Sequence, residues 1–503
     1  MEFFITTCFY FVFNRSGAVN YSVRGLIQNN FSHVSCLTPM SADKPKPYLS
    51  FYAPKQKVYP RAIDGKFNRW RWVLVFVTQL FFYGLPWLQW GERQMVLFDL
   101  GARRFYLFGL VLYPQDFIYL TGLLILSALS LFLFTAVAGR LWCGFSCPQS
   151  VYTEIFMWLE NRIEGDRSAR MRLDKAPWTA PEKLFKKGLK QLAWVGVALW
   201  TGFTFVGFFV PIRSLGVEIL HWQGSWQLFW VFFYGFATYG FAGYMREQVC
   251  KYMCPYARFQ SAMFDQDTLI VTYDSERGEP RGVRSKKVDP KAAGLGDCID
   301  CSLCVQVCPT GIDIRNGLQY ECIGCGLCVD ACNTVMDKVG YARGLIRFAT
   351  QNGIRQRWTN QQMLRRVFRP RVLGYGAVLL ALAVAMMVSL ALRTPLKVDV
   401  VRDRAALSRM VPGGKLENVY QLQIMNATET AQHYRIDAHG LQGLEVASTT
   451  TVEVPATASR WVPVQLHIPY GSAAPGSHPV YFTVQAVEHP AQVQEKATFL
   501  VPR

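Results

Sequence analysis

The chain lacks the common motifs for haem, nucleotide and flavin binding. None of its seven histidines lies in an apolar stretch long enough to cross a bilayer, which argues against a transmembrane haem held by two histidines. It has no Cys-x-x-Cys-His motif for covalent haem attachment. It has no P-loop, and no Gly-x-Gly-x-x-Gly followed by a suitable acidic residue. Any electrons that the chain handles must therefore come from a partner.

Charged residues are scarce. They make up 17% of the 503 residues, whereas 51% are hydrophobic, and this composition is typical of a membrane protein. Five charge-free apolar stretches are long enough to cross a bilayer. They are residues 72–90, 117–138, 191–212, 226–245 and 372–392. We therefore expect an α-helical transmembrane bundle of five spans.

The net charge of +18 would suit nucleic-acid binding, but its distribution argues against that partner. Lys and Arg outnumber acids eight to two in residues 40–71, ten to six in 139–190 and nine to none in 338–371. These segments alternate with loops that are sparse in Lys and Arg, as the positive-inside rule requires. The basic segments are thus predicted to be cytoplasmic, and residues 394–503 to lie on the far side of the membrane.

Residues 1–39 do not fit this plan. An apolar run at 3–13 is too short to span a bilayer and lacks the preceding positive charge of a signal peptide. Met40 opens a polar stretch that is typical of a cytoplasmic start. Our hypothesis is that residues 1–39 are an N-terminal extension that is not translated.

Eight cysteines between residues 298 and 332 carry the clearest chemical signal. They form two runs with x2-x2-x3 spacing, Cys298-x2-Cys301-x2-Cys304-x3-Cys308-Pro309 and Cys322-x2-Cys325-x2-Cys328-x3-Cys332. Bacterial two-cluster ferredoxins have this spacing, and the fourth cysteine of each run ligates the other cluster. Zinc knuckles use pairs of cysteines, so they and a disulfide framework are the weaker interpretations. The spacing predicts two [4Fe-4S] clusters, one held by Cys298, Cys301, Cys304 and Cys332, the other by Cys322, Cys325, Cys328 and Cys308.

A second set of thiols occurs in a repeated Cys-x3-Cys-Pro motif. Cys143 and Cys147 follow the second apolar stretch, and Cys250 and Cys254 follow the fourth. Proline is favoured at the first position of a helix, so Cys147 and Cys254 are expected at helix N-termini, where the pKa of a thiol falls. The four thiols are candidates for copper or redox chemistry. They would bind a soft ion such as Cu(I), hold a further iron–sulfur centre, cycle between dithiol and disulfide, or be buried structural thiols.

The tail changes character after the fifth apolar stretch. Short alternating runs of β-branched and aromatic residues are separated by Gly, Pro and Asn, and the segment has no cysteine. This pattern predicts an antiparallel β-sandwich of roughly seven strands at 394–503.

The order of these parts resembles the FixG/RdxA/CcoG family, whose members are accessory proteins for assembly of cbb-type cytochrome c oxidase. The resemblance runs from about residue 46 to the end. It includes both Cys-x3-Cys-Pro motifs and the segments Pro86-Trp87-Leu88-Gln89-Trp90, Arg93-Gln94, Leu97-Phe98-Asp99-Leu100, Pro114-Gln115-Asp116 and Asp337-Lys338-Val339-Gly340-Tyr341. Asn333 stands where the first run has Pro309, but neither residue is a ligand.

The resemblance implies a multi-domain protein of the bacterial inner membrane that acts as a cupric reductase. It implies a ferredoxin insert, a periplasmic immunoglobulin-like tail, a cytoplasmic electron donor, and oxidase subunits or a periplasmic copper chaperone as partners. The predicted domains are 1–39, a cytoplasmic segment 40–71, a four-helix membrane region 72–245, a cytoplasmic segment 246–371 with the ferredoxin at about 290–340, a fifth span 372–392 and the sandwich 394–503.

Two other functions remain open. Relatives with similar membrane parts, NapH and NosR, oxidise quinol, and that function would require a quinone cavity among the first four spans. In the third possibility the chain is a copper-binding assembly scaffold whose clusters are structural.

Overall fold

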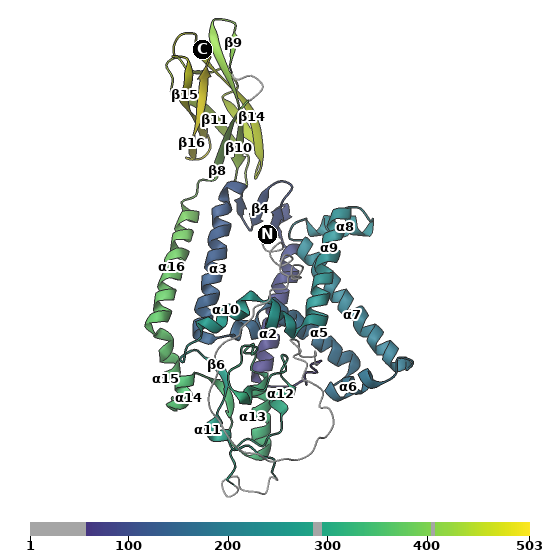
Figure 1. Cartoon of the computed structure of the whole chain (residues 1–503). Helices are drawn as coiled ribbons and strands as arrows, with labels where there is room; N and C mark the ends of the chain where they lie inside the picture. Colours follow the sequence, from purple (N-terminus) through teal and green to yellow (C-terminus); the bar gives the residue numbers. More distant parts are fainter. Residues whose placement is uncertain (1–56, 285–293, 404–407, 503) are drawn as a thin grey trace, which may run out of the picture. The chain divides into compact units, whose positions relative to one another are not determined.

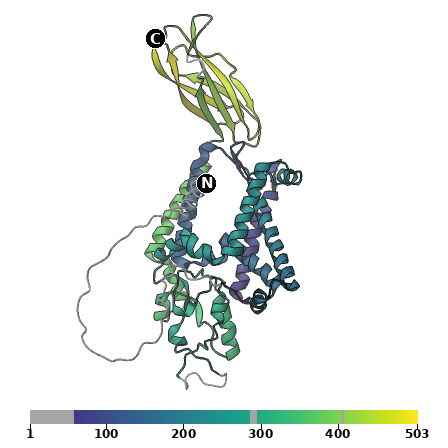
Figure 2. The same cartoon turned by 45° about the vertical axis from the view of Figure 1, so that its right-hand side comes forward.

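The computed structural model describes residues 57–284, 294–403 and 408–502. Residues 1–39, which we interpreted as an extension, and most of the predicted segment 40–71 lie outside these ranges. Figure 1 shows the element order and Figure 2 the same chain from another side.

Three helices in the described residues are long and apolar enough to cross a membrane: Pro114–Ala138, Pro181–Val206 and Pro370–Ala391. The predicted stretches 117–138 and 372–392 correspond to the helices α3 (Phe117–Ala138) and α16 (Pro370–Ala391). These two helices lie side by side in both views (Figures 1 and 2), and the Tyr119 hydroxyl donates to the Ser389 carbonyl at 3.1 Å.

The other three predicted stretches differ from the helices that form. The stretch 191–212 overlaps α7 (Pro181–Val206). The stretch 72–90 overlaps α2 (Lys66–Gly84), which gives way to a 3₁₀ turn, η1 (Leu85–Trp87), because Pro86 lacks an amide hydrogen for a continuing helix. The stretch 226–245 is divided between α9 (Ser225–Thr238) and a π-helix, η3 (Tyr239–Met245). Five spans thus remain a prediction.

Glycines let α7 and α9 pack closely. A Cβ placed on Gly202 of α7 would clash with the Val231 carbonyl oxygen and would lie 2.8 Å from the Gly235 nitrogen, both in α9. Small residues allow such backbone contact between membrane helices. Any side chain larger than hydrogen at Gly202 would separate the pair.

Short elements fill the segments between the long helices. A β-ribbon and a three-stranded antiparallel sheet precede α3. Their bounds are β1 (Gln89–Trp90), β2 (Arg93–Gln94), β3 (Val96–Asp99), β4 (Arg104–Leu107), β5 (Leu110–Leu112) and the 3₁₀ turn η2 (Pro114–Asp116). Further helices are α4 (Leu141–Phe145), α5 (Pro148–Glu164), α6 (Arg167–Lys175), α8 (Ile212–Leu220), a π-helix η4 (Val249–Met253) and α10 (Pro255–Met263).

The cysteine-rich segment folds between the two strands of a small sheet. Strand β6 (Ile270–Tyr273) pairs antiparallel with β7 (Ile346–Ala349). Between and after them lie α11 (Ser275–Gly278), α12 (Leu303–Gln306), the 3₁₀ turn η5 (Ile314–Asn316), α13 (Leu327–Val339), α14 (Gln351–Arg355), α15 (Asn360–Arg365) and the 3₁₀ turn η6 (Arg366–Phe368). The buried Asp330 of α13 accepts hydrogen bonds from the backbone N–H groups of Phe67 and Asn68, so it caps the start of α2.

The tail forms two antiparallel sheets with strand orders β12-β14-β10-β8, with β9 also on β10, and β13-β11-β15-β16. The strands are β8 (Leu396–Arg402), β9 (Arg409–Val411), β10 (Lys415–Asn426), β11 (Gln432–His439), β12 (Glu445–Val446), β13 (Thr451–Val454), β14 (Ser459–Pro469), β15 (Gly476–Ala486) and β16 (Gln492–Val501). Alternate residues of β10, among them Tyr420 and Leu422, are fully buried in the core. This sandwich agrees with the fold predicted from the alternating pattern, and the short strands β9 and β12 account for the extra strands.

Candidate iron–sulfur and thiol site

The eight cysteines of the two runs surround two small cavities. Each cavity is lined by cysteines of both runs. The first has Cys298, Cys301, Cys304 and Cys332, and the second has Cys304, Cys308, Cys322, Cys325 and Cys328. The first three cysteines of each run therefore meet the fourth cysteine of the other run.

Tight loops and short helices position these thiols. Cys304 and Cys328 lie in the first turns of α12 and α13. Gly326 precedes α13 with a φ of +75°, and a Cβ at this position would lie 2.8 Å from the ring of Phe67. Only glycine fits this left-handed, crowded position without strain. We refer to residues 322–328 as the second cluster loop.

The surroundings of the two cavities suit an iron–sulfur cluster. Apolar residues such as Val271, Ile314 and Met336 line them together with the sulfurs. Burial raises the pKa of Cys304 and Cys325 to about 11. A buried thiolate needs a bound cation to offset its lost hydration. The iron ions of an iron–sulfur cluster, each bound by one cysteine thiolate, would supply that positive charge. The donor set therefore fits the group.

The eight cysteines differ in exposure. Cys298, Cys304 and Cys325 are buried, whereas Cys301 is exposed to solvent. The first cavity is thus nearer the surface. No three His, Cys, Asp or Glu side chains in the described part of the chain are grouped so as to hold a single metal ion.

The structure also brings together the four cysteines of the Cys-x3-Cys-Pro motifs, here called the four-cysteine set. Cys147 and Cys254 directly precede α5 and α10, which both begin with proline. Cys143 lies in α4 and Cys250 in η4. Each of the four thiols lies within electrostatic range of the other three, but among the described residues no three of them are grouped closely enough to hold one metal ion.

The predicted pKa decrease at the helix N-terminus is wrong for Cys147. Burial raises the pKa of its thiol, and this effect exceeds the opposing hydrogen bonds from the backbone of Ser150 and Gln149. Burial also raises the pKa of Cys143 and Cys250 to about 12. The four thiols are half-buried, and at Cys147 this partial loss of hydration outweighs the effect of the helix N-terminus.

The four-cysteine set lies directly on the second cluster loop. Gly144 lies between Cys143 and Cys147 and is the point at which this turn touches the loop. A Cβ on Gly144 would lie 2.7 Å from the Cys325 Cα and 2.8 Å from the Ile323 carbonyl oxygen. Cys143 and Cys250 pack against the apolar cluster that contains Ile323 and Cys325. The two candidate sites therefore share one wall.

Two buried arginines stand at this wall. The Arg71 Nε donates to the Gly144 carbonyl at 3.0 Å, and its guanidinium pairs with Glu154 at 2.8 Å. Arg71 acts electrostatically on Cys325. Arg140 donates to the carbonyls of Tyr320 and Ala257.

The charge of Arg140 reaches both sites, because it acts on Cys322 of the loop and on Cys143 and Cys250 of the four-cysteine set. Sequence reasoning counted Arg71 and Arg140 only as basic residues of cytoplasmic segments. Arg140 directly precedes the first Cys-x3-Cys-Pro motif and Arg71 lies far from it in the sequence, and neither position indicated burial.

Gln260 is a further residue that sequence reasoning missed. It is fully buried, and its Nε2 lies 3.5 Å from the Cys143 Sγ. It follows Cys254 by less than two turns of α10, so it joins the two motifs and fixes the orientation of the Cys143 thiol. Only its short distance from Cys254 in the sequence hinted at this contact.

Comparison with known proteins finds family models over three segments of the chain. Residues 245–351 match the model of a 4Fe-4S dicluster domain, residues 120–165 that of a 4Fe-4S binding domain, and residues 386–502 that of an IG-like fold at the C-terminal of FixG. The crystal structure of a FixG-related protein from Vibrio parahaemolyticus is 21% identical, with a TM-score of 0.20 over 22% of this chain and 97% of that one.

Curated relatives match over most of their length. Protein RdxA of Cereibacter sphaeroides is 39% identical over 84% of this chain and 91% of its own. Protein RdxB of the same organism is 40% identical, over 81% and 88%. The nitrogen fixation protein FixG of Rhizobium meliloti is 38% identical, over 75% and 78%. With its ferredoxin cysteines and FixG-type tail, the chain belongs to the FixG/RdxA family of iron–sulfur electron-transfer proteins.

Proposed function

We propose that this chain is a membrane-bound cupric reductase, which reduces Cu(II) to Cu(I) for the assembly of a cbb-type cytochrome c oxidase. One observation carries the proposal: the four-cysteine set and the second cluster loop are in backbone contact at Gly144 and Cys325. A copper ion on these thiols would lie next to an electron source. Cys143 and Cys250 of the set pack against the same apolar cluster as Cys325.

The proposal includes the cluster ligands predicted from the spacing. Cys298, Cys301, Cys304 and Cys332 would hold one [4Fe-4S] cluster, and Cys322, Cys325, Cys328 and Cys308 the other. The lining of the two cavities supports this division. When bound, the clusters supply single-electron transfer.

The thiols favour the reduced product. Soft sulfur ligands prefer Cu(I) to Cu(II), so the four-cysteine set draws the substrate ion toward reduction. Each Cu(II) takes one electron and forms Cu(I). Gln260 orients the Cys143 thiol, and the Arg140 charge would offset part of the negative charge that Cys143 and Cys250 acquire when they lose their protons to bind copper.

The proposed setting is a bacterial inner membrane crossed by α2, α3, α7, α9 with η3, and α16. Residues 40–71, 139–190 and 246–371 would be cytoplasmic, and the sandwich 394–503 periplasmic. The large apolar side chains on the surface of α2 support its membrane position, since Phe76 and Leu80 are 68% and 73% exposed. The sandwich would meet oxidase subunits or a periplasmic copper chaperone.

A second candidate function for the four-cysteine set is a third iron–sulfur centre. The 4Fe-4S binding model at residues 120–165 covers Cys143 and Cys147, which favours this alternative. Iron and sulfide analysis with low-temperature EPR separates the two. Two cubane clusters give about eight irons for each chain, and a third would raise the count to about twelve.

The copper reaction is tested with purified full-length protein reduced by dithionite and then freed of reductant. We expect Cu(II) to reoxidise the clusters rapidly, and the absorbance of the clusters measures this reaction. The variants Cys143→Ser and Cys250→Ser should slow it by about tenfold or more, whereas Ser146→Ala in the same turn should not. Reoxidation only by a quinone would favour a quinol-linked electron-transfer subunit. Clusters inert to both, with tight Cu(I) binding, would favour the scaffold.

A further inference from the structure

The chain reaches both Cys-x3-Cys-Pro motifs through the same sharp turn of the backbone. Gly139 follows α3 and precedes Cys143 by four residues, with φ and ψ of +55° and −126°. Arg246 follows η3 and precedes Cys250 by four residues, with φ and ψ of +37° and −108°. Glycine adopts a positive φ freely, whereas a residue with a side chain is strained there. Contacts of the Arg246 side chain must therefore offset this strain.

The Arg246 side chain is clamped to α5 and α7. Its guanidinium donates at 2.8 Å to Glu160 of α5, whose side chain is only 2% exposed. Its Nε donates at 2.8 Å to the Gly243 carbonyl, and the guanidinium lies 5.3 Å from the centre of the Trp194 ring of α7. The Arg246 carbonyl accepts a hydrogen bond of 3.2 Å from Gln149 in the first turn of α5. The helix that follows the first motif thus holds the turn that precedes the second motif.

The helix that follows the second motif holds the first motif in return. Arg140, beside the first turn, donates to the Ala257 carbonyl of α10. Gln260 of the same helix places its Nε2 3.5 Å from the Cys143 Sγ. The two motifs are therefore cross-braced, because each one is bonded to the helix that follows the other.

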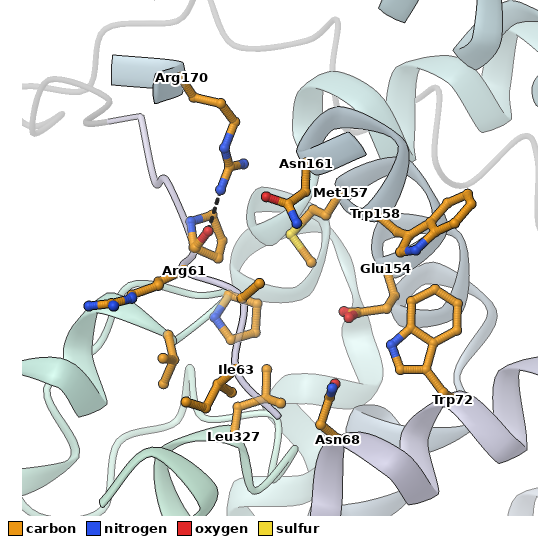
Figure 3. A pocket seen from close by; sticks show the side chains of 14 residues that line it. Arg61, Ile63, Asn68, Trp72, Glu154, Met157, Trp158, Asn161, Arg170 and Leu327 are labelled. Carbon is orange, nitrogen blue, oxygen red and sulfur yellow. Dashed lines mark hydrogen bonds between the residues drawn. The ribbon is translucent and has the colours of Figure 1, made fainter. Parts of the chain in front are cut away.

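Helix α5 supports the clamp firmly because other parts of the chain hold it. Figure 3 shows Trp158 of α5 next to Trp72 of α2, and the centres of these rings lie 6.2 Å apart. The same figure shows Arg170 of α6 bonded to a carbonyl of the segment that precedes α2. Arg170 also pairs with Glu160 at 3.4 Å. The Glu160 carboxylate is thus held in place on the side away from Arg246.

The position of the second motif decides what the four-cysteine set can bind. The first motif is fixed by the contact of Gly144 with the second cluster loop. The second motif lies in and beside η4, a π-helix with no buried residue, and π-helical turns are rare and often occur at functional sites. Among the residues that the structure describes, no three of the thiols are grouped closely enough to hold one ion. A metal centre shared by both motifs therefore depends on where the turn at Arg246 places η4.

We propose that Arg246 is a positioning residue of the four-cysteine set. Clamped to Glu160 and Gln149 of α5, it fixes the turn before η4 and so places Cys250 and Cys254 beside the first motif. Arg246 acts through the backbone and does not touch the metal. The inference rests on the proposed function in one respect, since it assigns the copper ion to thiols of both motifs.

Replacing Arg246 by glycine tests the clamp while it keeps the turn. Glycine adopts a positive φ without strain, as Gly139 does at the first motif, so Arg246→Gly removes only the side-chain contacts. Arg103→Gly is the matched control, because Arg103 also has a positive φ of +54° but is exposed in the turn between β3 and β4. Arg246→Lys keeps a positive charge for Glu160.

Anaerobic alkylation of the full-length protein measures the position of the thiols without any copper. Iodoacetamide should label Cys250 faster in Arg246→Gly than in wild type, because Cys250 is released from the apolar cluster against which it packs. Cys143 should react as before, because Gln260 and the second cluster loop still hold it. Arg103→Gly should match wild type at both thiols.

Copper affinity measures the consequence for the site. In anaerobic competition with bathocuproine disulfonate, Arg246→Gly should bind Cu(I) about tenfold or more weakly than wild type, equivalent to about 1.4 kcal/mol. Arg246→Lys should lie between the two, and Arg103→Gly should bind as wild type. The iron content of the two predicted clusters should be equal in all variants.

Three results would overturn the inference. Labelling of Cys250 could be unchanged in Arg246→Gly, so that the clamp would not position the thiol. The Cu(I) affinity of Arg246→Gly could equal that of wild type, which, with or without a lower Tm, would leave Arg246 a merely structural role. Arg103→Gly could have the same effects as Arg246→Gly. A wild-type protein that binds no Cu(I) would instead refute the cupric reductase, and the labelling of Cys250 would still decide the role of Arg246.

Discussion

Replacing Gly144 by alanine tests whether the four-cysteine set and the second cluster loop are in contact. The new Cβ would lie 2.7 Å from the Cys325 Cα, 2.8 Å from its nitrogen and 2.8 Å from the Ile323 carbonyl oxygen. All three are backbone atoms, so no side-chain rotation can relieve the clash. The two segments must move apart by several tenths of an ångström or more.

Overpacking of this kind destabilises a protein by about 1–3 kcal/mol. For a part of about 100 residues, such as the ferredoxin segment, each kcal/mol lowers Tm by roughly 4–8 °C. We therefore expect Gly144→Ala to lower the Tm of the ferredoxin part by several degrees. This Tm is measured as the temperature at which the cluster absorbance is lost. Reoxidation of the clusters by Cu(II) should also slow, because the thiols are displaced from the loop.

Gly188→Ala is the control, since its Cβ meets open space and alanine has the higher helix propensity. It should leave Tm and the rate of reoxidation unchanged or raise Tm slightly. An unchanged Tm together with an unchanged rate in Gly144→Ala would refute the contact. It would also remove the observation on which the proposed electron transfer to copper depends.

Three other perturbations address the charges and the metal. Arg140→Gln should lower the reduction potential of the cluster beside Cys322, because it removes a positive charge that acts on this ligand. An EPR redox titration that finds an unchanged potential contradicts this. Burial opposes ionisation of Glu417, but hydrogen bonds and charges from His467 and Arg409 outweigh it and lower the pKa of the Glu417 carboxyl in the folded protein. The ionised carboxylate therefore stabilises the fold at pH values above the pKa of the unfolded chain. This stabilisation is lost as pH falls through the pKa of the folded protein. Hydrogen exchange of the full chain should show β10 and β14 losing protection below about pH 4.5, and Glu417→Gln should flatten that dependence. Removal of iron by an anaerobic chelator should abolish the hydrogen-exchange protection of α13 but not that of the sandwich, because α13 contains predicted cluster ligands and the sandwich contains none.

Local patterns in the sequence predicted much of the architecture. The charge-free stretches at 117–138 and 372–392 agree with α3 and α16, since uninterrupted apolar sequence determines both length and position. The alternating runs after residue 394 predicted the sandwich, because each strand buries every second residue. The stretch at 72–90 was placed too far along the chain, because composition alone does not register the break at Pro86.

The parts of the candidate site that the sequence did not predict depend on contacts between distant segments. The meeting of Gly144 with Cys325 joins positions far apart in the chain, and no local pattern encodes it. The burial of Cys147, which reverses the expected change in its pKa, follows from the same packing.

The contrast between exposed Cys301 and buried Cys325 has a consequence for how the protein fails in air. Dioxygen and peroxide would reach the exposed Cys301 first, so oxidative damage would begin at the cluster that Cys301 holds and would spare the other cluster for longer. A partly damaged chain would then lose the cluster that Cys301 holds and keep the cluster of the second cluster loop, which lies beside the four-cysteine set. Inactivation under aeration should accordingly proceed in two stages rather than one.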